Sequence, residues 1–199
     1  MEAMRIIMDE HQSLAAIIHA IRLMIHEIGA GKLQPDFKLF AAMVRYLDAY
    51  PEKRHHPKED AFLFAPLKAR THEGDEALAR LEAEHAQAEA RIATLQAALA
   101  RYTDGAPDGF ARFSAAFDAY ADFYRNHMLL EEREILPLVK KHFTADDWAA
   151  ADAGFAATPD PMGGTRSTGS DDDFRRIFSK LVAAAPAPIG LGAGPYQDD

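Results

Sequence analysis

The sequence predicts an all-α protein: an up-down four-helix bundle with a short extra helix and a C-terminal extension. Apolar residues recur at intervals of three and four along four long segments. Almost no stretch alternates with the period of two that a half-buried strand requires. The connections between the segments are short, which favours antiparallel neighbours. We expect residues 1–157 to form the bundle and residues 158–199 to form the extension.

The first two helices are marked by apolar stripes and by breakers at their ends. Residues 1–28 repeat apolar side chains on one face, and Gly29 follows, as glycine often does beyond a helix end. Residues 36–50 form the next amphipathic segment. Pro51 restarts or kinks this helix, because proline is tolerated in a first helical turn. The continuation reaches about Arg70.

The second half of the bundle has stronger helix formers. Residues 75–102 are rich in Ala, Glu, Leu and Gln, which have high helix propensity. A loop with two glycines and a proline separates them from a fourth helix over residues 110–142. Thr144 and Asp147 then form the pattern of a capped helix start, so a short extra helix should run to Phe155.

The extension differs in composition from the bundle. From Thr158 the chain is rich in proline, glycine and serine, which indicates a linker. Within residues 171–184, apolar side chains recur at the spacing of one helix face, at Phe174, Ile177, Phe178 and Leu181. We expect this stripe to dock on the bundle or on a second subunit of a homo-oligomer. A disordered tail is the rival interpretation.

Composition and charge exclude several functions. The chain has 22 Lys and Arg against 31 Asp and Glu, a formal net charge of −9. A nucleic acid or an anionic membrane is therefore not expected as a partner, because both require a basic surface. With no cysteine, any metal must be held by nitrogen and oxygen ligands. No apolar run approaches a membrane span or a signal-peptide core, so we expect a cytoplasmic protein.

Each of the four long segments carries a histidine on its apolar face, and three of these are followed four residues later by a glutamate. That spacing places both side chains on one helix face. The candidate ligands, with the adjacent His56 included, are His11, His55, His56, Glu59, His85, Glu89, His127 and Glu131. One such pair would be an ordinary surface pair. Three on apolar faces indicate a metal site, since converging buried carboxylates repel one another unless cations neutralise them.

The types of candidate ligand limit which metals the site could hold. Imidazole and carboxylate together suit iron, manganese or zinc. Eight candidates fit two ions bridged by carboxylates better than one ion. The remaining histidines lie off the centre of a stripe or at another level of the bundle, so we expect structural or surface roles for His19, His26, His72 and His142. Glu132 points away from His127 on an ideal helix, which leaves Glu131 as the preferred partner.

The order of these residues resembles a known family. His11 is followed by the run His55-His56-Pro57-Lys58-Glu59-Asp60, then by the His85 segment, and then by His127 with Glu131, Glu132 and Ile-Leu-Pro. This order is similar to that of the HHE branch of the hemerythrin-like proteins, over about residues 6–155.

The resemblance implies a bundle that holds two iron ions, bridged by carboxylates and an oxo or hydroxo group. Such proteins bind O₂ or respond to O₂, NO or iron. It implies His11 as the first-helix ligand, His55 with Glu59 on the second helix, His85 on the third, and His127 with Glu131 on the last. Oxygen carriers of the family have a second histidine where this chain has Glu89, and an aspartate where it has Glu132.

Two other functions remain open. A ferritin-like oxidase or peroxide-consuming enzyme would use Glu-x-x-His motifs, and the chain contains Glu52-x-x-His55 and Glu82-x-x-His85. That assignment leaves His11 unexplained. A purely structural bundle without metal is the third reading. The preferred prediction is a metal-binding or sensing protein whose ligand is a small diatomic molecule or peroxide.

Overall fold

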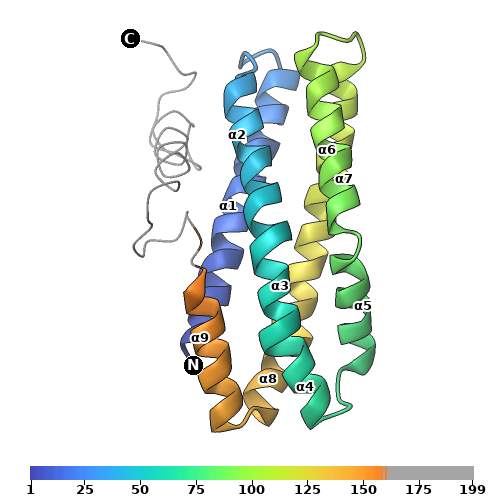
Figure 1. Ribbon diagram of the computed structural model, residues 1–199. Helices are drawn as coiled ribbons and strands as arrows, with labels where there is room; N and C mark the ends of the chain where they lie inside the picture. Colours follow the sequence, from blue (N-terminus) through green and yellow to red (C-terminus); the bar gives the residue numbers. More distant parts are fainter. Residues whose placement is uncertain (159, 161–199) are drawn as a thin grey trace.

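The computed structural model describes residues 1–158 and residue 160. Every element in this part of the chain is a helix, and Figure 1 shows the helices running side by side as long columns. The prediction of an all-α bundle is confirmed. The amphipathic segment expected over residues 171–184 lies outside the described residues.

Several columns are made of consecutive helical segments. The first column is α1 (Glu2–Gly29). The second comprises α2 (Phe37–Leu47), η1 (Asp48–His55), α3 (His56–Glu59), η2 (Asp60–Phe64) and α4 (Ala65–Arg70). The third comprises α5 (Asp75–His85) and α6 (Ala88–Thr103). The fourth comprises α7 (Gly109–Leu130), η3 (Glu131–Ile135) and α8 (Leu136–His142), and α9 (Ala145–Ala157) follows it.

The segments η1, η2 and η3 are π-helical, and they flank the candidate ligands. The first ends at His55, the second begins directly after Glu59, and the third begins at Glu131. Pro51 lies inside η1, where its missing N–H cannot take part in a regular α-helical ladder. Wider turns of this kind often occur at functional sites, because they change which side chains face inward.

The third column is broken where the sequence predicted one helix over residues 75–102. That prediction was wrong at Ala86 and Gln87, where a turn separates α5 from α6. Neither glycine nor proline marks the break. Its effect is to end the helix at His85 and to reset the direction of the residues that follow, and Glu89 is exposed.

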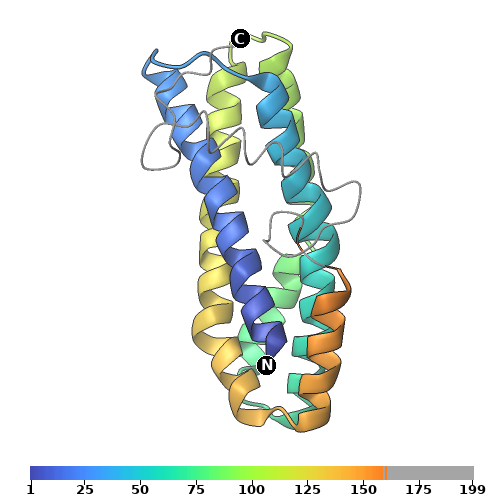
Figure 2. The same cartoon turned by 90° about the vertical axis from the view of Figure 1, so that its left-hand side faces the viewer.

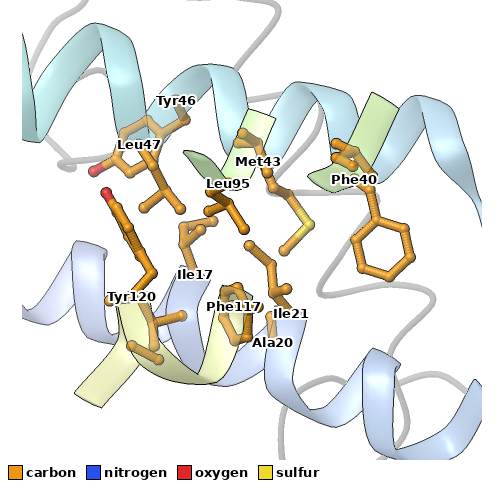
Figure 3. Packing of buried hydrophobic residues seen from close by; sticks show 14 of the residues in the cluster. Ile17, Ala20, Ile21, Phe40, Met43, Tyr46, Leu47, Leu95, Phe117 and Tyr120 are labelled. Atoms are coloured by element: carbon orange, nitrogen blue, oxygen red, sulfur yellow. The ribbon is translucent and has the colours of Figure 1, made fainter. Parts of the chain in front are cut away.

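The buried apolar side chains form two clusters along the bundle. The upper cluster includes Ile17, Met43, Leu95 and Phe117, from four different helices, and Figure 3 shows their side chains meeting. The lower cluster, nearer the N-terminus, is formed by Ala3, Met4, Ile7, Leu63, Phe64, Leu67, Ala77, Leu78, Leu81, Ile135, Leu136, Val139, Ala151 and Phe155.

Each column changes from one cluster to the other at its histidine. In α1, for example, Ile7 belongs to the lower cluster, Leu14 to the upper, and His11 lies between them. In the fourth column, Tyr124 and Ile135 enclose His127 in the same way. A layer of polar side chains is therefore enclosed above and below by apolar packing.

Helix α9 covers the N-terminal part of α1, as Figures 1 and 2 show from two sides. Its start is capped as the sequence predicted, with Thr144 and Asp147 forming a capping box. Phe155 is fully buried, and Asp152 accepts a hydrogen bond from the backbone N–H of Ala3 at 2.7 Å. Across the described part of the chain, no helix combines the length and apolarity needed to cross a lipid bilayer.

Candidate metal centre

Five histidines from all four columns meet in the polar layer. They are His11 from α1, His55 and His56 from the second column, His85 from α5 and His127 from α7. None of these side chains is more than 6 % exposed. His55 and His56 are adjacent in the sequence and are both buried; their ring centres are 5.9 Å apart.

The side chains form two groups with metal-binding geometry. One group contains His11, His55, Glu59 and Glu131, and the other contains His56, Glu59, His85 and His127. Within each group, one ligand atom from every residue lies within 4.8 Å of the others. Glu59 belongs to both groups, which places them next to each other.

Glu59 and Glu131 each direct one oxygen atom toward each group. Glu59 Oε1 lies 3.0 Å from His55 Nε2, whereas its Oε2 lies 3.7 Å from His85 Nε2. Glu131 Oε2 lies 3.3 Å from His11 Nε2, and its Oε1 lies 3.6 Å from His127 Nε2. Both carboxylates therefore have the placement of bridging ligands.

A second ring of carboxylates orients the histidines from outside. Four Nδ1 atoms are hydrogen-bonded to a carboxylate: His11 to Glu132 at 2.9 Å, His55 to Glu10 at 2.6 Å, His85 to Asp60 at 2.8 Å and His127 to Glu84 at 2.8 Å. His56 Nδ1 lies 3.4 Å from Glu52. A carboxylate at Nδ1 fixes the hydrogen on that nitrogen and leaves Nε2 free to bind a metal.

The buried histidines and carboxylates of the polar layer shift one another's pKa values. Burial on its own raises the pKa of the Glu59 carboxyl, but the adjacent His55, His11 and His85 hold that pKa well below its ordinary value. Burial disfavours imidazolium at His55, yet Glu59 and Glu10 raise the pKa of His55 to about 9. The carboxylates thus require positive charge beside them, which either imidazolium or a bound cation can supply.

Several inward-facing atoms have no hydrogen-bond partner within the described residues. They are His11 Nε2, Glu59 Oε2 and both carboxylate oxygens of Glu131, all buried. In addition, His85 Nε2 and His127 Nε2 lie 3.2 Å apart, although both Nδ1 atoms face carboxylates. Two nitrogen lone pairs at this distance repel unless a cation lies between them. Unpaired buried polar atoms are rare in proteins, so the residues present fit a metal site.

The structure brings together seven of the eight candidate ligands and leaves Glu89 outside. Glu89 is exposed beyond the break at Ala86 and Gln87, so it belongs to neither group. Glu132 contacts His11 from the outer ring. The four histidines expected elsewhere, His19, His26, His72 and His142, are outside both groups.

Sequence reasoning missed most of the outer ring. Glu10, Asp60 and Glu84 each pair with a histidine on another helix, so their spacing along the chain carries no periodic pattern. Glu52, considered for a ferritin-like motif, lies beside His56 Nδ1 and accepts a hydrogen bond from Tyr120 at 3.0 Å. Glu82 of the second such motif pairs with Lys68 at the surface.

The fold and the site define a class, a helical bundle that binds metal cations through histidine and carboxylate side chains. Comparison with known families agrees: the Hemerythrin family, described as the hemerythrin HHE cation binding domain, matches residues 3–139. The chain belongs to this family. Neither the curated proteins nor the solved structures gave a match. The matched region ends in α8, so α9 lies beyond it.

Proposed function

We propose that the chain holds two iron ions, one in each group, and that it binds or senses a small diatomic ligand, O₂ or NO. The observation that carries the proposal is the pair of groups joined by Glu59 and Glu131, whose four carboxylate oxygens are divided between them. Ligands of nitrogen and oxygen only suit iron, with manganese or zinc as competitors. When bound, iron supplies redox chemistry and a binding position for a diatomic molecule.

The two groups differ in a way that supports ligand binding at one ion. His56, His85 and His127 give one group three imidazoles, whereas the other has only His11 and His55. With both carboxylates shared, the ion beside His11 and His55 has fewer protein ligands. An external ligand would therefore bind there.

Metal analysis with optical spectroscopy tests this function. Full-length protein is reconstituted with ferrous iron without air, and its iron content is measured after removal of loosely bound metal. We expect about two irons per chain, an absorption band in the near ultraviolet after exposure to air, and a changed spectrum when NO is added to the reduced protein. Iron content near zero under these conditions contradicts the proposal.

A peroxide-consuming enzyme is the second candidate, and the buried phenol of Tyr124 favours it. Its Oη lies 3.4 Å from His56 Nε2, next to the three-histidine group, and phenols can supply an electron during oxidation chemistry. Consumption of hydrogen peroxide by the iron-loaded protein, with loss of that activity in Tyr124→Phe, would favour the enzyme. The outer-ring and surface positions of Glu52 and Glu82 speak against a ferritin-like ligand set.

A further inference from the structure

A groove on the surface of the bundle reaches one of the ligand histidines. It has a volume of about 340 Å³ and runs between α1 on one side and α7 with η3 on the other. Its walls are partly apolar, with Met8, Met128 and Leu129 among them, and its polar lining includes His11 and Glu132. Of the five site histidines, His11 is the one that lines this groove.

The position of the groove relates it to the ion with fewer protein ligands. His11 belongs to the two-histidine group, where we expect an external ligand to bind. Between the groove and that group stand the His11 ring, which is 3 % exposed, and the Glu132 carboxylate, which is about one-third exposed. Glu132 is held by its hydrogen bond to His11 Nδ1. Of the groove lining, these two side chains lead to that group: His11 belongs to it and Glu132 contacts His11.

The charge of the groove is opposite to that of the whole chain. Arg125 and Arg133 line it, and neither forms an ion pair with any residue that the structure describes. Six other arginines in the described part of the chain pair with acidic side chains: Arg5, Arg22, Arg70, Arg80, Arg101 and Arg112. Glu132 is the one acidic residue of the lining; it is hydrogen-bonded to His11 and also interacts electrostatically with Arg133. On a chain of net charge −9, two guanidinium groups beside a single carboxylate form a local site of attraction for anions.

The size of the groove limits what it can hold. Ligand pockets for small organic molecules begin at roughly 300 Å³, so this groove is at the lower limit. A triatomic or tetra-atomic inorganic anion with some of its water fits. Met8 and Met128 are flexible walls that can adjust around such an ion.

We propose that this groove collects small inorganic anions through Arg125 and Arg133 and delivers them past Glu132 to the ion held by His11 and His55. The inference rests on the proposed function for delivery, but the collection of anions by the two arginines can be tested separately. What the groove adds to that site is a route of entry and two side chains, Arg125 and Arg133, that attract anions before they reach the ion.

Azide is a suitable anionic probe and NO a neutral one. We compare iron-loaded full-length wild type with the double variant Arg125→Gln/Arg133→Gln by stopped-flow absorbance. At low salt we expect azide association to slow about tenfold in the variant, since electrostatic steering changes on-rates by ~10 to 10³. The difference should shrink at about 0.5 M salt, where screening extends over only a few ångströms. NO association should stay within about twofold.

The matched control is Arg101→Gln/Arg112→Gln, which removes the same charge at the other end of the bundle. Arg112 lies roughly 20 Å along the fourth column from the level of His127. Azide association in this control should equal that of wild type. Equal slowing in the control, an equal loss of NO association, or unchanged azide association in Arg125→Gln/Arg133→Gln overturns the proposal.

A second measurement does not depend on iron. In the protein as purified, azide is titrated while the arginine side-chain Nε–H signals are followed by NMR. We expect shifts at Arg125 and Arg133 and none at Arg101 and Arg112. An absence of these shifts at tens of millimolar azide overturns the anion site, even if iron analysis supports the proposed function. If these shifts occur in a protein that fails to bind iron, they would support the anion site in the groove and contradict the proposed function.

Discussion

Single residues of the metal centre divide into those that face inward and those that orient them. In four of the candidate ligands, His11, His55, His85 and His127, Nε2 faces Glu59 or Glu131, while Nδ1 faces an outer carboxylate. A substitution in the first set removes a ligand atom. A substitution in the second leaves the ligand in place but frees its ring to rotate. The two kinds of change should therefore differ in magnitude.

Alanine substitution of an inward histidine should remove metal. We expect His11→Ala, His85→Ala and His127→Ala each to lose at least one bound ion per chain, because each ring supplies an atom of one group. His19→Ala and His26→Ala are the controls, since both side chains are exposed and outside the groups. Elemental analysis of each purified variant measures its metal content. A control variant that loses as much metal as His85→Ala would show that the groups are misassigned.

The outer ring should have a smaller, measurable effect. Glu10→Gln keeps the size of the side chain but removes the charge that faces His55 Nδ1 at 2.6 Å. We expect iron affinity to fall about 10- to 100-fold, the usual effect of losing such an orienting partner. Glu89→Gln is the matched control and should leave affinity unchanged, because Glu89 is exposed beyond the helix break. Competition with a chelator measures both, and a loss in Glu89→Gln would return that residue to the ligand set.

At the scale of helical elements, the sequence placed the candidate ligands better than the carboxylates that orient them. The i, i+4 spacing predicted that Glu59 and Glu131 lie beside their histidines, because each pair shares one column and near-helical geometry continues between its members. The same spacing does not bring Glu89 into either group, because the column breaks after His85 without a glycine or proline. Partners such as Glu84 join different columns, and their positions depend on packing that no single periodic pattern contains.

Helix α9 and the residues after it connect to the site through a buried lysine. Lys58 Nζ donates hydrogen bonds to Glu10 at 2.7 Å and to the backbone carbonyl of Thr158 at 3.1 Å, and it lies 5.1 Å from the centre of the Phe155 ring. Tyr50 also donates a hydrogen bond to Glu10. Helix α9, which the family match does not cover, thus helps to position Lys58, and Lys58 balances the charge of the outer-ring carboxylate Glu10.

Lys58→Met should be strongly destabilising. It leaves the buried Glu10 carboxylate without its ammonium partner, and breaking a buried pair typically costs about 3–5 kcal/mol of unfolding free energy. Glu10→Gln/Lys58→Met removes both charges and should recover part of that loss. Urea unfolding of wild type, each single variant and the double variant gives the coupling between the two positions. Additive effects in this cycle would contradict a direct pair.

For the molecule as a whole, the polar layer that contains the candidate metal centre lies between two apolar clusters and links all four columns. A metal that binds only the folded chain stabilises it by mass action, about 4 kcal/mol when free metal exceeds its dissociation constant a thousandfold. In a domain of this size, that corresponds to roughly 8–16 °C in Tm. Calorimetry with and without iron measures the shift, and an unchanged Tm on loading would contradict a site shared by the four columns.

Without metal, the same layer should make stability depend on pH through His55. Its pKa is about 9 in the folded chain, against about 6.5 in an unfolded one. Protonated His55 therefore stabilises the metal-free fold fully below pH 6.5, and this contribution falls as pH rises and is lost above pH 9. The difference in pKa corresponds to about 3 kcal/mol. Metal-bound imidazole is already deprotonated, so the iron-loaded protein should lack this slope. Denaturation of both forms between pH 6 and pH 10 tests the prediction, and parallel pH profiles for the two forms would refute it.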